Sequence, residues 1–534
     1  MCPQNREKIT NPLICGHFTT ASLFYGKLNM FVLTAVILLL SPPPLYNYSV
    51  LLTAPFGGSH LALMSHLARI LSDHGHVAVI ATPEHDAVIS TNHTLLTPHT
   101  PGLGFTKTER SRMSAECMKE IMGTDTSLST VAHIGADCRR EAWGAILRLS
   151  SYYFLGQKFV EQIRQLKIDL IIADDANIRD MSILAAELNI PLICFSPWSN
   201  HFRAREAGGY SQLLTKEPSH MWPHLLHQGF TVTGCLQAYI NYFKFRKYAE
   251  DREGDAGAAV DVYLVNDVTY FSYPYMSPPN LYLVGGIYLS PHPAPLDTEY
   301  SHFTSSSQVV YVSFGSYAIP DWLPWFPTLF EALESSKATS VIAKINQGPG
   351  YLVSGTSRKF IFKNWVPQQA LLGSGRVKLF ISHCGQNSRI EAAYYGVPML
   401  CIPLFGDQVL NSYLMQWNKF GIIQKKEEVE MRKLRDLIDN MLENSTVFRS
   451  NIDRARSMFI EDPISKPDKF LFLVNTLGKN GKGALKVIRN PQDSAVIINI
   501  VGILFLSSIS FLFFYISLEI GSLPDENERF LDMW

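Results

Sequence analysis

Charged residues are scarce in this sequence, and they form no long run of one sign. Asp, Glu, Lys and Arg make up 17% of the 534 residues, and 46 basic against 47 acidic residues give a formal net charge of −1. Proteins that bind nucleic acid usually carry a basic face or a basic run that pairs with phosphates. The sequence therefore predicts no nucleic-acid partner.

Cysteine is equally sparse, and its spacing fits no zinc site. The eight cysteines include no CxxC pair, which is the usual spacing in a structural zinc site. Cys2 and Cys15 precede an apolar stretch that looks like a signal peptide, so six cysteines would remain in the mature chain. We expect no metal site, and the sequence does not determine which cysteines pair.

Uncharged apolar stretches are few, but two of them predict a membrane protein. Residues 31–40 have the length of a signal-peptide core and are followed by Ser41 and three prolines. Residues 495–518 carry no charge and are long enough to cross a bilayer. The alternatives are a buried strand for the first stretch and a buried helix for the second.

Much of the remaining chain alternates short apolar strands with amphipathic helices, which is typical of an α/β protein. Residues 50–54, 61–73 and 76–81 predict a strand, a helix and a second strand, and such a unit implies parallel pairing. The pattern recurs at residues 168–195 and again from residue 309. Since the chain is too long for one core, we expect two such domains.

The run HCGQNSRIEAAYYGVPMLCIPLFGDQ, from His383 to Gln408, predicts a phosphate site. A strand over residues 377–382 leads into a glycine-containing loop, and a helix follows over residues 387–395 until Gly396 stops it. The free N–H groups and positive dipole end of such a helix favour a phosphate. Further side-chain donors at this point come from His383, Asn387 and Ser388.

The same run also carries acidic and amide groups suited to sugar hydroxyls. Glu391 lies one turn into the helix, where it can reach a ribose. Asp407 and Gln408 follow the next strand, at the edge where open α/β sheets bind ligands. Diphosphate, ribose and a second polyol together describe a nucleotide sugar.

With residues 364–368 (NWVPQ) just upstream, this run resembles the signature of the membrane-bound UDP-glycosyltransferases, the glucuronosyl and glucosyl transferase family. The resemblance spans about residues 48–518. It implies a GT-B type α/β fold of two facing Rossmann-like domains plus a C-terminal transmembrane helix. The expected parts are an extension and signal peptide (1–45), an acceptor-binding domain (46–283), a linker (284–303), a UDP-sugar-binding domain (304–494), a transmembrane helix (495–518) and a cytosolic tail (519–534).

The family resemblance also assigns the UDP-sugar contacts. It implies that Trp365 stacks on the uracil, that Gln368 lies near the ribose and that Ser316 reaches the diphosphate. Lys344 stands where the family commonly has Arg, and a lysine cannot form a bidentate fork with phosphate. Taken without the resemblance, Trp365 could be a core residue and Ser316 a turn serine. The full expected set is Ser316, Lys344, Trp365, Gln368, His383, Gly385, Asn387, Ser388, Glu391, Asp407 and Gln408.

The resemblance places the catalytic base at His60, in Pro-Phe-Gly-Gly-Ser-His before a helix. A histidine base needs a partner that fixes its tautomer. Asp174, at the end of the strand over residues 168–173, is the expected partner, and Asp175 is the second choice. The implied reaction is a single in-line displacement that inverts the anomeric carbon of the UDP-sugar. No cofactor is expected, and the sequence has no Asp-x-Asp triplet, the usual metal–diphosphate site of the other glycosyltransferase architecture.

The expected protein is a single-pass enzyme of the endoplasmic reticulum membrane with lumenal catalytic domains, which transfers a hexose or hexuronic acid to a small lipophilic acceptor. A non-catalytic protein that binds nucleotide sugars or lipophiles on the same fold is the alternative, and a signal-anchored receptor or scaffold is a third hypothesis. The sequence leaves open the sugar, the acceptor, a homo-oligomeric state and the retention signal, because the tail has no dilysine motif.

Overall fold

The computed structural model of the protein describes the chain in stretches separated by gaps. They are residues 47–89, 93–99, 102–109, 144–198, 259–272, 278–305, 308–315, 323–345, 359–405 and 407–485, with residue 508. From Tyr48 onward these residues belong to one unit of the chain. No helix in these stretches is both long and apolar enough to span a membrane. The expected signal peptide lies outside them, as does the expected membrane helix except for Ser508.

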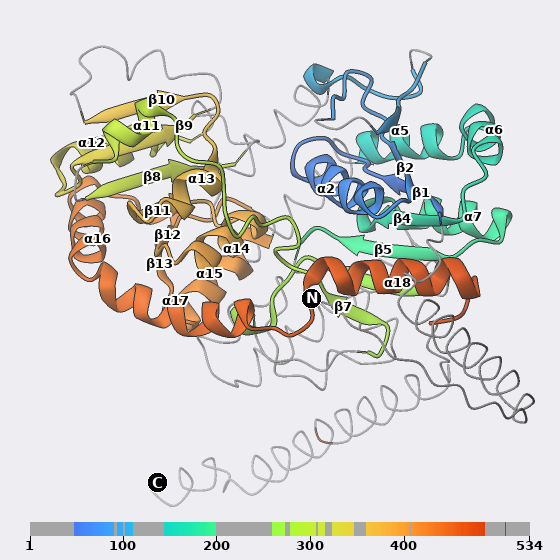
Figure 1. Cartoon of the computed structure of the whole chain (residues 1–534). Coiled ribbons are helices and arrows are strands. Elements are labelled where there is room, and N and C mark those ends of the chain that lie inside the picture. Colours follow the sequence, from blue (N-terminus) through green and yellow to red (C-terminus); the bar gives the residue numbers. More distant parts are fainter. Residues whose placement is uncertain are drawn as a thin grey trace, which may run out of the picture. The chain divides into compact units, whose positions relative to one another are not determined.

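Parallel strands form the sheet of the first lobe, in the order β3-β2-β1-β4-β5-β6-β7 (Figure 1). The strands are β1 (Ser49–Thr53), β2 (Val77–Ala81), β3 (Thr94–Leu96), β4 (Leu170–Asp174), β5 (Leu192–Ser196), β6 (Val262–Val265) and β7 (Leu281–Leu283). The order of the strands reverses between β1 and β4. In open α/β sheets, ligands bind at the carboxyl ends of the strands beside such a reversal.

The helices of the first lobe bury one apolar face against this sheet. In α2 the predicted face is buried, since Leu63, Leu67, Ile70 and Leu71 are all less than 10% exposed. In the described part of this lobe, the helical elements are α2 (Ser59–Asp73), α5 (Gly144–Phe154), α6 (Gln157–Gln165), η2 (Asp175–Asn177) and α7 (Ile178–Leu188). The 3-10 turn η5 (Thr269–Phe271) follows β6 in the chain, but its Phe271 is buried in a core cluster of the second lobe.

The second lobe repeats the parallel arrangement, with the strand order β10-β9-β8-β11-β12-β13. Its strands are β8 (Val309–Ser313), β9 (Ser340–Lys344), β10 (Phe360–Lys363), β11 (Val377–Ser382), β12 (Met399–Cys401) and β13 (Gly421–Ile423). Its helices are α11 (Thr298–Phe303), α12 (Phe326–Ser335), α13 (Gln368–Gly373), α14 (Gln386–Tyr395), α15 (Asp407–Trp417), η7 (Lys426–Glu428), α16 (Met431–Glu443) and α17 (Ser445–Ile460). Here the order reverses between β8 and β11, so this lobe has a binding edge of the same kind.

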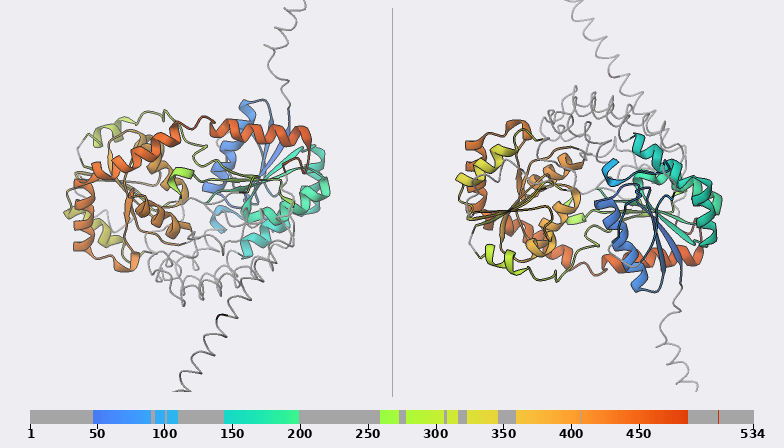
Figure 2. Two further views of the ribbon diagram at one scale, coloured as in Figure 1. Left: turned by 90° about the horizontal axis from the view of Figure 1, so that it is seen from below. Right: turned by 90° about the horizontal axis from the view of Figure 1, so that it is seen from above.

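The helix α18 (Lys466–Asn480) follows the second lobe in the chain but packs with the first. Phe470, Leu473 and Leu477 are fully buried in one cluster with Val50 and Leu52 of β1. Figures 1 and 2 show α18 beside the first sheet in every view. Burying this apolar face ties α18 to β1, the first strand of the sheet.

The predicted element boundaries agree with the structure closely around the sequence signature. The strand predicted over residues 377–382 is β11, and the helix predicted over 387–395 is α14, which starts one residue earlier. The first helix starts at Ser59 instead of residue 61, because the Ala62 N–H already donates to the Gly58 carbonyl at 3.0 Å. His60 therefore lies in the first helical turn and not before it.

Candidate active site

His60 and Asp174 meet at the strand-order reversal of the first sheet. β1 leads through a short loop to His60 in α2, and Asp174 is the last residue of the neighbouring strand β4. The Nδ1 atom of His60 lies 2.6 Å from Oδ2 of Asp174. His60 is 8% exposed and Asp174 is fully buried.

This contact determines the tautomer of His60. An ionised carboxylate only accepts hydrogen bonds, so Nδ1 carries the hydrogen and Nε2 keeps its lone pair. Asp174 is held in turn, because its Oδ1 accepts the Ala176 N–H at 3.0 Å at the start of η2. The pair thus has the geometry of a general base with a fixed orienting acid.

The charges around His60 also adjust its proton affinity. Burial lowers the pKa of His60, but the charge and the hydrogen bond of Asp174 outweigh it, and the net pKa is raised above the usual 6.5. Asp175 and Asp407 raise the pKa further. Asp407 belongs to the second lobe, so residues of both lobes act on this imidazole.

Asp175, the second choice for the partner of His60, binds other groups instead. Its Oδ2 accepts hydrogen bonds from Ser196 Oγ at 3.0 Å and from the Trp198 indole N–H at 2.7 Å. The Trp198 ring packs edge-on against the His60 ring, with centroids 5.0 Å apart. Phe56 packs edge-on at 5.3 Å. His60 therefore has aromatic neighbours, which restrict the rotation of its ring.

Trp365 presents a large apolar surface at the carboxyl edge of the second sheet. It follows β10, and 75% of its surface is exposed, which rules out a core role. The Lys344 Nζ atom lies 6.0 Å from the centre of its ring and donates a hydrogen bond to the Gly315 carbonyl at 2.8 Å. Burial, with the nearby charge of Lys107, lowers the pKa of Lys344.

Gln368, Ser388 and Glu391 form one hydrogen-bonded group. The Gln368 side-chain nitrogen donates to Glu391 Oε2 at 2.8 Å and to Ser388 Oγ at 3.3 Å, while its oxygen accepts from the Tyr311 hydroxyl at 3.0 Å. Glu391 is 7% exposed, and burial raises its pKa to about 7 despite the hydrogen bonds from Gln368 and Tyr288. The group offers a preorganised acceptor whose charge changes near neutral pH.

His383 fills the space between two loops of the second lobe. A Cβ atom on Gly315 would lie 2.8 Å from its Nε2 atom, and one on Gly385 would lie 2.5 Å from it. Any larger residue at these two positions would displace the ring. Burial and the charge of Lys344 lower the pKa of His383 to about 4. The imidazole is therefore neutral at physiological pH and carries one N–H. The ring already makes a hydrogen bond with the Ser313 backbone, and its Nδ1 atom lies 3.2 Å from Ser382 Oγ.

Asn387, at the N-terminal end of α14, is already engaged by the first lobe. Its Oδ1 accepts a hydrogen bond from Asn266 Nδ2 at 2.8 Å, and its backbone carbonyl accepts one from Tyr288 at 3.2 Å. From the sequence, we expected Asn387 to contact only the ligand. Contact with a residue 121 positions away has no signature in the local sequence.

Asp407 and Gln408 form the first turn of α15, directly after β12 and its loop. The Gln408 side-chain oxygen accepts the backbone N–H groups of Leu404 and Phe405 at 2.9 and 3.2 Å, which leaves its NH₂ group for other partners. Asp407 Oδ2 accepts a hydrogen bond from Asn411 at 2.8 Å. Burial raises the pKa of Asp407, while Asn411 and the charges of Arg389 and His60 oppose that rise. Ser316, the remaining expected contact, lies outside the described residues.

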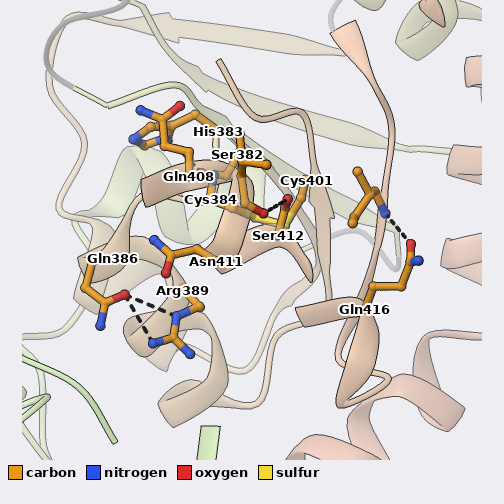
Figure 3. The surroundings of a disulfide bond; sticks show 12 residues. Ser382, His383, Cys384, Gln386, Arg389, Cys401, Gln408, Asn411, Ser412 and Gln416 are labelled. Atoms are coloured by element: carbon orange, nitrogen blue, oxygen red, sulfur yellow. Dashed lines mark hydrogen bonds between the residues drawn. A yellow bond between two sulfur atoms is a disulfide. The ribbon is translucent and has the colours of Figure 1, made fainter. Parts of the chain in front are cut away.

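A disulfide joins Cys384 to Cys401 beneath the phosphate-type loop (Figure 3). Cys384 follows His383, and Cys401 is the last residue of the neighbouring strand β12, with Cα atoms 5.4 Å apart. The sequence did not determine this pairing. The paired register of Ser382 with Cys401 on β11 and β12 brings the two cysteines together.

Solved structures of glycosyltransferases share this arrangement. Phytolacca americana UGT2, complexed with UDP-2fluoro-glucose and pterostilbene, aligns with a TM-score of 0.57 at 15% identity, over 81% of this chain and 100% of that chain. The glycosyltransferase VinC, in complex with DTDP, aligns with a TM-score of 0.55 at 17% identity, again over 81% and 100%. Together with the two parallel sheets, these likenesses show the GT-B glycosyltransferase fold.

The family follows from the sequence comparison. Residues 49–491 match the model of the family described as UDP-glucoronosyl and UDP-glucosyl transferase, and the chain belongs to this family. UDP-glucuronosyltransferase 1A3 of Rattus norvegicus is 25% identical over 484 residues, covering 85% of this chain and 87% of the relative. UDP-glucuronosyltransferase 3A1 of Bos taurus is 25% identical over 480 residues, covering 82% and 85%. The protein is a UDP-glycosyltransferase, an enzyme that transfers a sugar from a UDP-sugar.

Proposed function

We propose that the protein is an inverting glycosyltransferase that moves a hexose or hexuronic acid from a UDP-sugar to a hydroxyl of a small lipophilic acceptor. The observation that carries the proposal is the buried contact of 2.6 Å between His60 Nδ1 and Asp174 Oδ2. It leaves Nε2 of His60 as a base, and the acceptor hydroxyl gives its proton to this atom.

The reaction is one displacement at the anomeric carbon. As the acceptor O–H proton passes to His60 Nε2, the acceptor oxygen forms a bond to that carbon. The bond between the carbon and the UDP oxygen breaks on the opposite face, so an α-linked donor yields a β-glycoside. Asp174 stabilises the imidazolium that forms, and UDP leaves with the electron pair of the broken bond.

The second lobe supplies the groups that hold the UDP-sugar. We assign the uracil to the exposed face of Trp365 and the ribose to Glu391, with Gln368 as its support. The diphosphate is assigned to the N-terminal end of α14, with His383, Asn387, Ser388 and, from the sequence, Ser316 as further donors and Lys344 as the nearby cation. The sugar hydroxyls are assigned to Asp407 and the NH₂ group of Gln408.

The proposed acceptor is apolar and small because the base lies among aromatic rings. Phe56 and Trp198 both contact His60 edge-on, and such walls bind an apolar ring better than a charged chain. Two glycosyltransferase neighbours are in complexes with small aromatic molecules, pterostilbene and 3,4-dichloroaniline. The UDP-sugar is a co-substrate in this proposal, and no separate cofactor enters it.

We place the enzyme in the endoplasmic reticulum membrane, with the catalytic lobes in the lumen. The predicted signal peptide and the apolar stretch 495–518 support this placement, and so does the disulfide, since disulfides persist in oxidising compartments. Protease treatment of sealed microsomes should leave the lobes intact and remove only the tail. Digestion of the lobes without detergent would contradict the proposed orientation.

The test of the catalytic proposal compares three variants of the full chain with a UDP-sugar and a panel of phenols. His60→Ala should lower kcat by about 10²–10⁴-fold, the range typical of a lost general base. Asp174→Asn should move the acidic limb of the kcat profile to lower pH, because Asp174 raises the pKa of His60. His74→Ala, an exposed histidine at the other end of α2, is the matched control. Turnover by His60→Ala at the wild-type rate would refute the proposal.

A further inference from the structure

We propose that Asn266, in the first lobe, is a positioning residue for the UDP-sugar: it turns the Asn387 side chain so that its NH₂ group faces the phosphates. The inference rests on the proposed role of Asn387 at the diphosphate. Asn266 does not itself touch the ligand in this proposal. Through Asn266, the first lobe orients a side chain in the UDP-sugar site of the second lobe.

The hydrogen bonds of Asn266 determine which way both amides point. Asn266 Nδ2 donates to the Pro197 carbonyl at 2.9 Å and to Asn387 Oδ1 at 2.8 Å. A backbone carbonyl can only accept, so Asn266 has to present its nitrogen to Pro197. The second hydrogen of this NH₂ group then points to Asn387, which must accept it through its side-chain oxygen. The NH₂ group of Asn387 is thereby directed away from Asn266, where it can donate to a phosphate oxygen.

Asn266 cannot easily adopt the opposite orientation. The residue is fully buried, directly after β6. Its backbone N–H donates to the Ser196 carbonyl at 2.9 Å, and its backbone carbonyl accepts from the Gln386 side chain. A flipped amide would bring Oδ1 against the Pro197 and Asn387 oxygens. Oδ1 has no partner within the described part of the chain, so both donors are retained at the cost of one unsatisfied acceptor.

Asp267, the next residue, holds α14 in place through a separate set of contacts. The position of α14 therefore does not depend on the Asn266 side chain, whereas the orientation of the Asn387 amide does. Asp267 Oδ1 accepts from Arg389 Nη2 at 2.5 Å, and Arg389 Nη1 donates to the Phe271 carbonyl at 2.7 Å. Arg389 is fully buried, and its side chain also donates to Gln386 (Figure 3). Because these contacts hold the helix, changing Asn266 should turn the Asn387 amide without moving α14.

A double-mutant cycle tests whether Asn266 acts through Asn387. Calorimetry on the full chain in detergent would measure the Kd of UDP and of uridine, which lacks the phosphates. Asn266→Leu should raise the Kd of UDP about three- to tenfold and leave that of uridine unchanged. In an Asn387→Ala background, Asn266→Leu should have no further effect on UDP. Asn280→Leu is the control, since Asn280 is a buried asparagine of the same lobe whose Nδ2 donates to the Asp261 carbonyl.

Each outcome decides the inference. Equal losses for UDP and uridine, no loss, or the same loss in both backgrounds would overturn it, because a residue with a merely structural role does not distinguish the phosphates. If Asn266→Leu does not fold, Asn266→Ala is measured in the same cycle and judged by the same criteria. A wild-type protein that binds neither UDP nor uridine would instead refute the proposed donor site.

Discussion

Glu391→Gln should stabilise the ligand-free protein at pH 8 and weaken its binding of UDP. Burial raises the pKa of Glu391 from the usual 4.5 to about 7. An acid with a raised pKa in the folded state destabilises that state wherever the unfolded chain ionises it. The loss of unfolding free energy that Glu391 causes is absent below pH 4.5, grows between pH 4.5 and 7, and reaches its full size above pH 7.

The size of the effect follows from the same two pKa values. The difference between about 7 and 4.5 corresponds to roughly 3 kcal/mol of unfolding free energy above pH 7, and to about 1 kcal/mol at pH 5. Glutamine cannot ionise, and its side-chain oxygen still accepts the hydrogen bond from Gln368. The substitution therefore removes a penalty that depends on pH and preserves most of the packing.

Urea titrations of the ligand-free full chain at pH 5 and pH 8 would measure the change. The gain in apparent unfolding free energy should be larger at pH 8 by about 2 kcal/mol. At pH 8 the Kd of UDP should rise about tenfold, since a hydrogen bond to a charged group is lost. Equal gains at both pH values, or a loss of stability at pH 8, would show that the carboxyl group is not held at a raised pKa.

Two further predictions concern the second lobe. Trp365→Ala should raise the Kd of uridine measured by calorimetry about fivefold, because roughly 1 kcal/mol of stacking is lost. The melting temperature should not change, because Trp365 is 75% exposed. Unaltered uridine binding would contradict the assignment of Trp365 to the uracil. Replacing Cys384 and Cys401 with serine should cost about 3 kcal/mol of stability in urea titrations, from the loop of 17 residues that the bond closes. Reductant should lower the stability of the wild type by the same amount as these substitutions, and it should not lower the stability of the variant. A variant whose stability falls in reductant would contradict this reasoning.

The parts of the fold that could be predicted are those with a strong local pattern. The strand at 377–382, the α14 helix and its end at Gly396 were predicted within a residue, because a buried strand, a helix and a left-handed glycine cap each have their own local sequence signals. The start of α2 was predicted two residues too late, at residue 61 instead of Ser59, because Gly58 and Ser59 also fit a loop. The return of α18 to the first lobe was not predicted, because its apolar face fits either core.

In the candidate site, too, local sequence patterns predicted some features and only the tertiary structure decided others. The sequence alone determined the residue types at the donor site, since a glycine loop before a helix and an acid one turn later are local patterns that suit a nucleotide sugar. The role of His60 as the base came from the family resemblance. The pairing of His60 with Asp174, 114 positions away, was already expected from the sequence and the family resemblance. Two other partners were decided only by tertiary structure: Asn387 meets Asn266 across 121 positions, and Cys384 meets Cys401 across neighbouring strands. The physical reason is that a hydrogen bond or a disulfide depends on distance in space, and parallel sheets bring together strand ends that are remote in the chain.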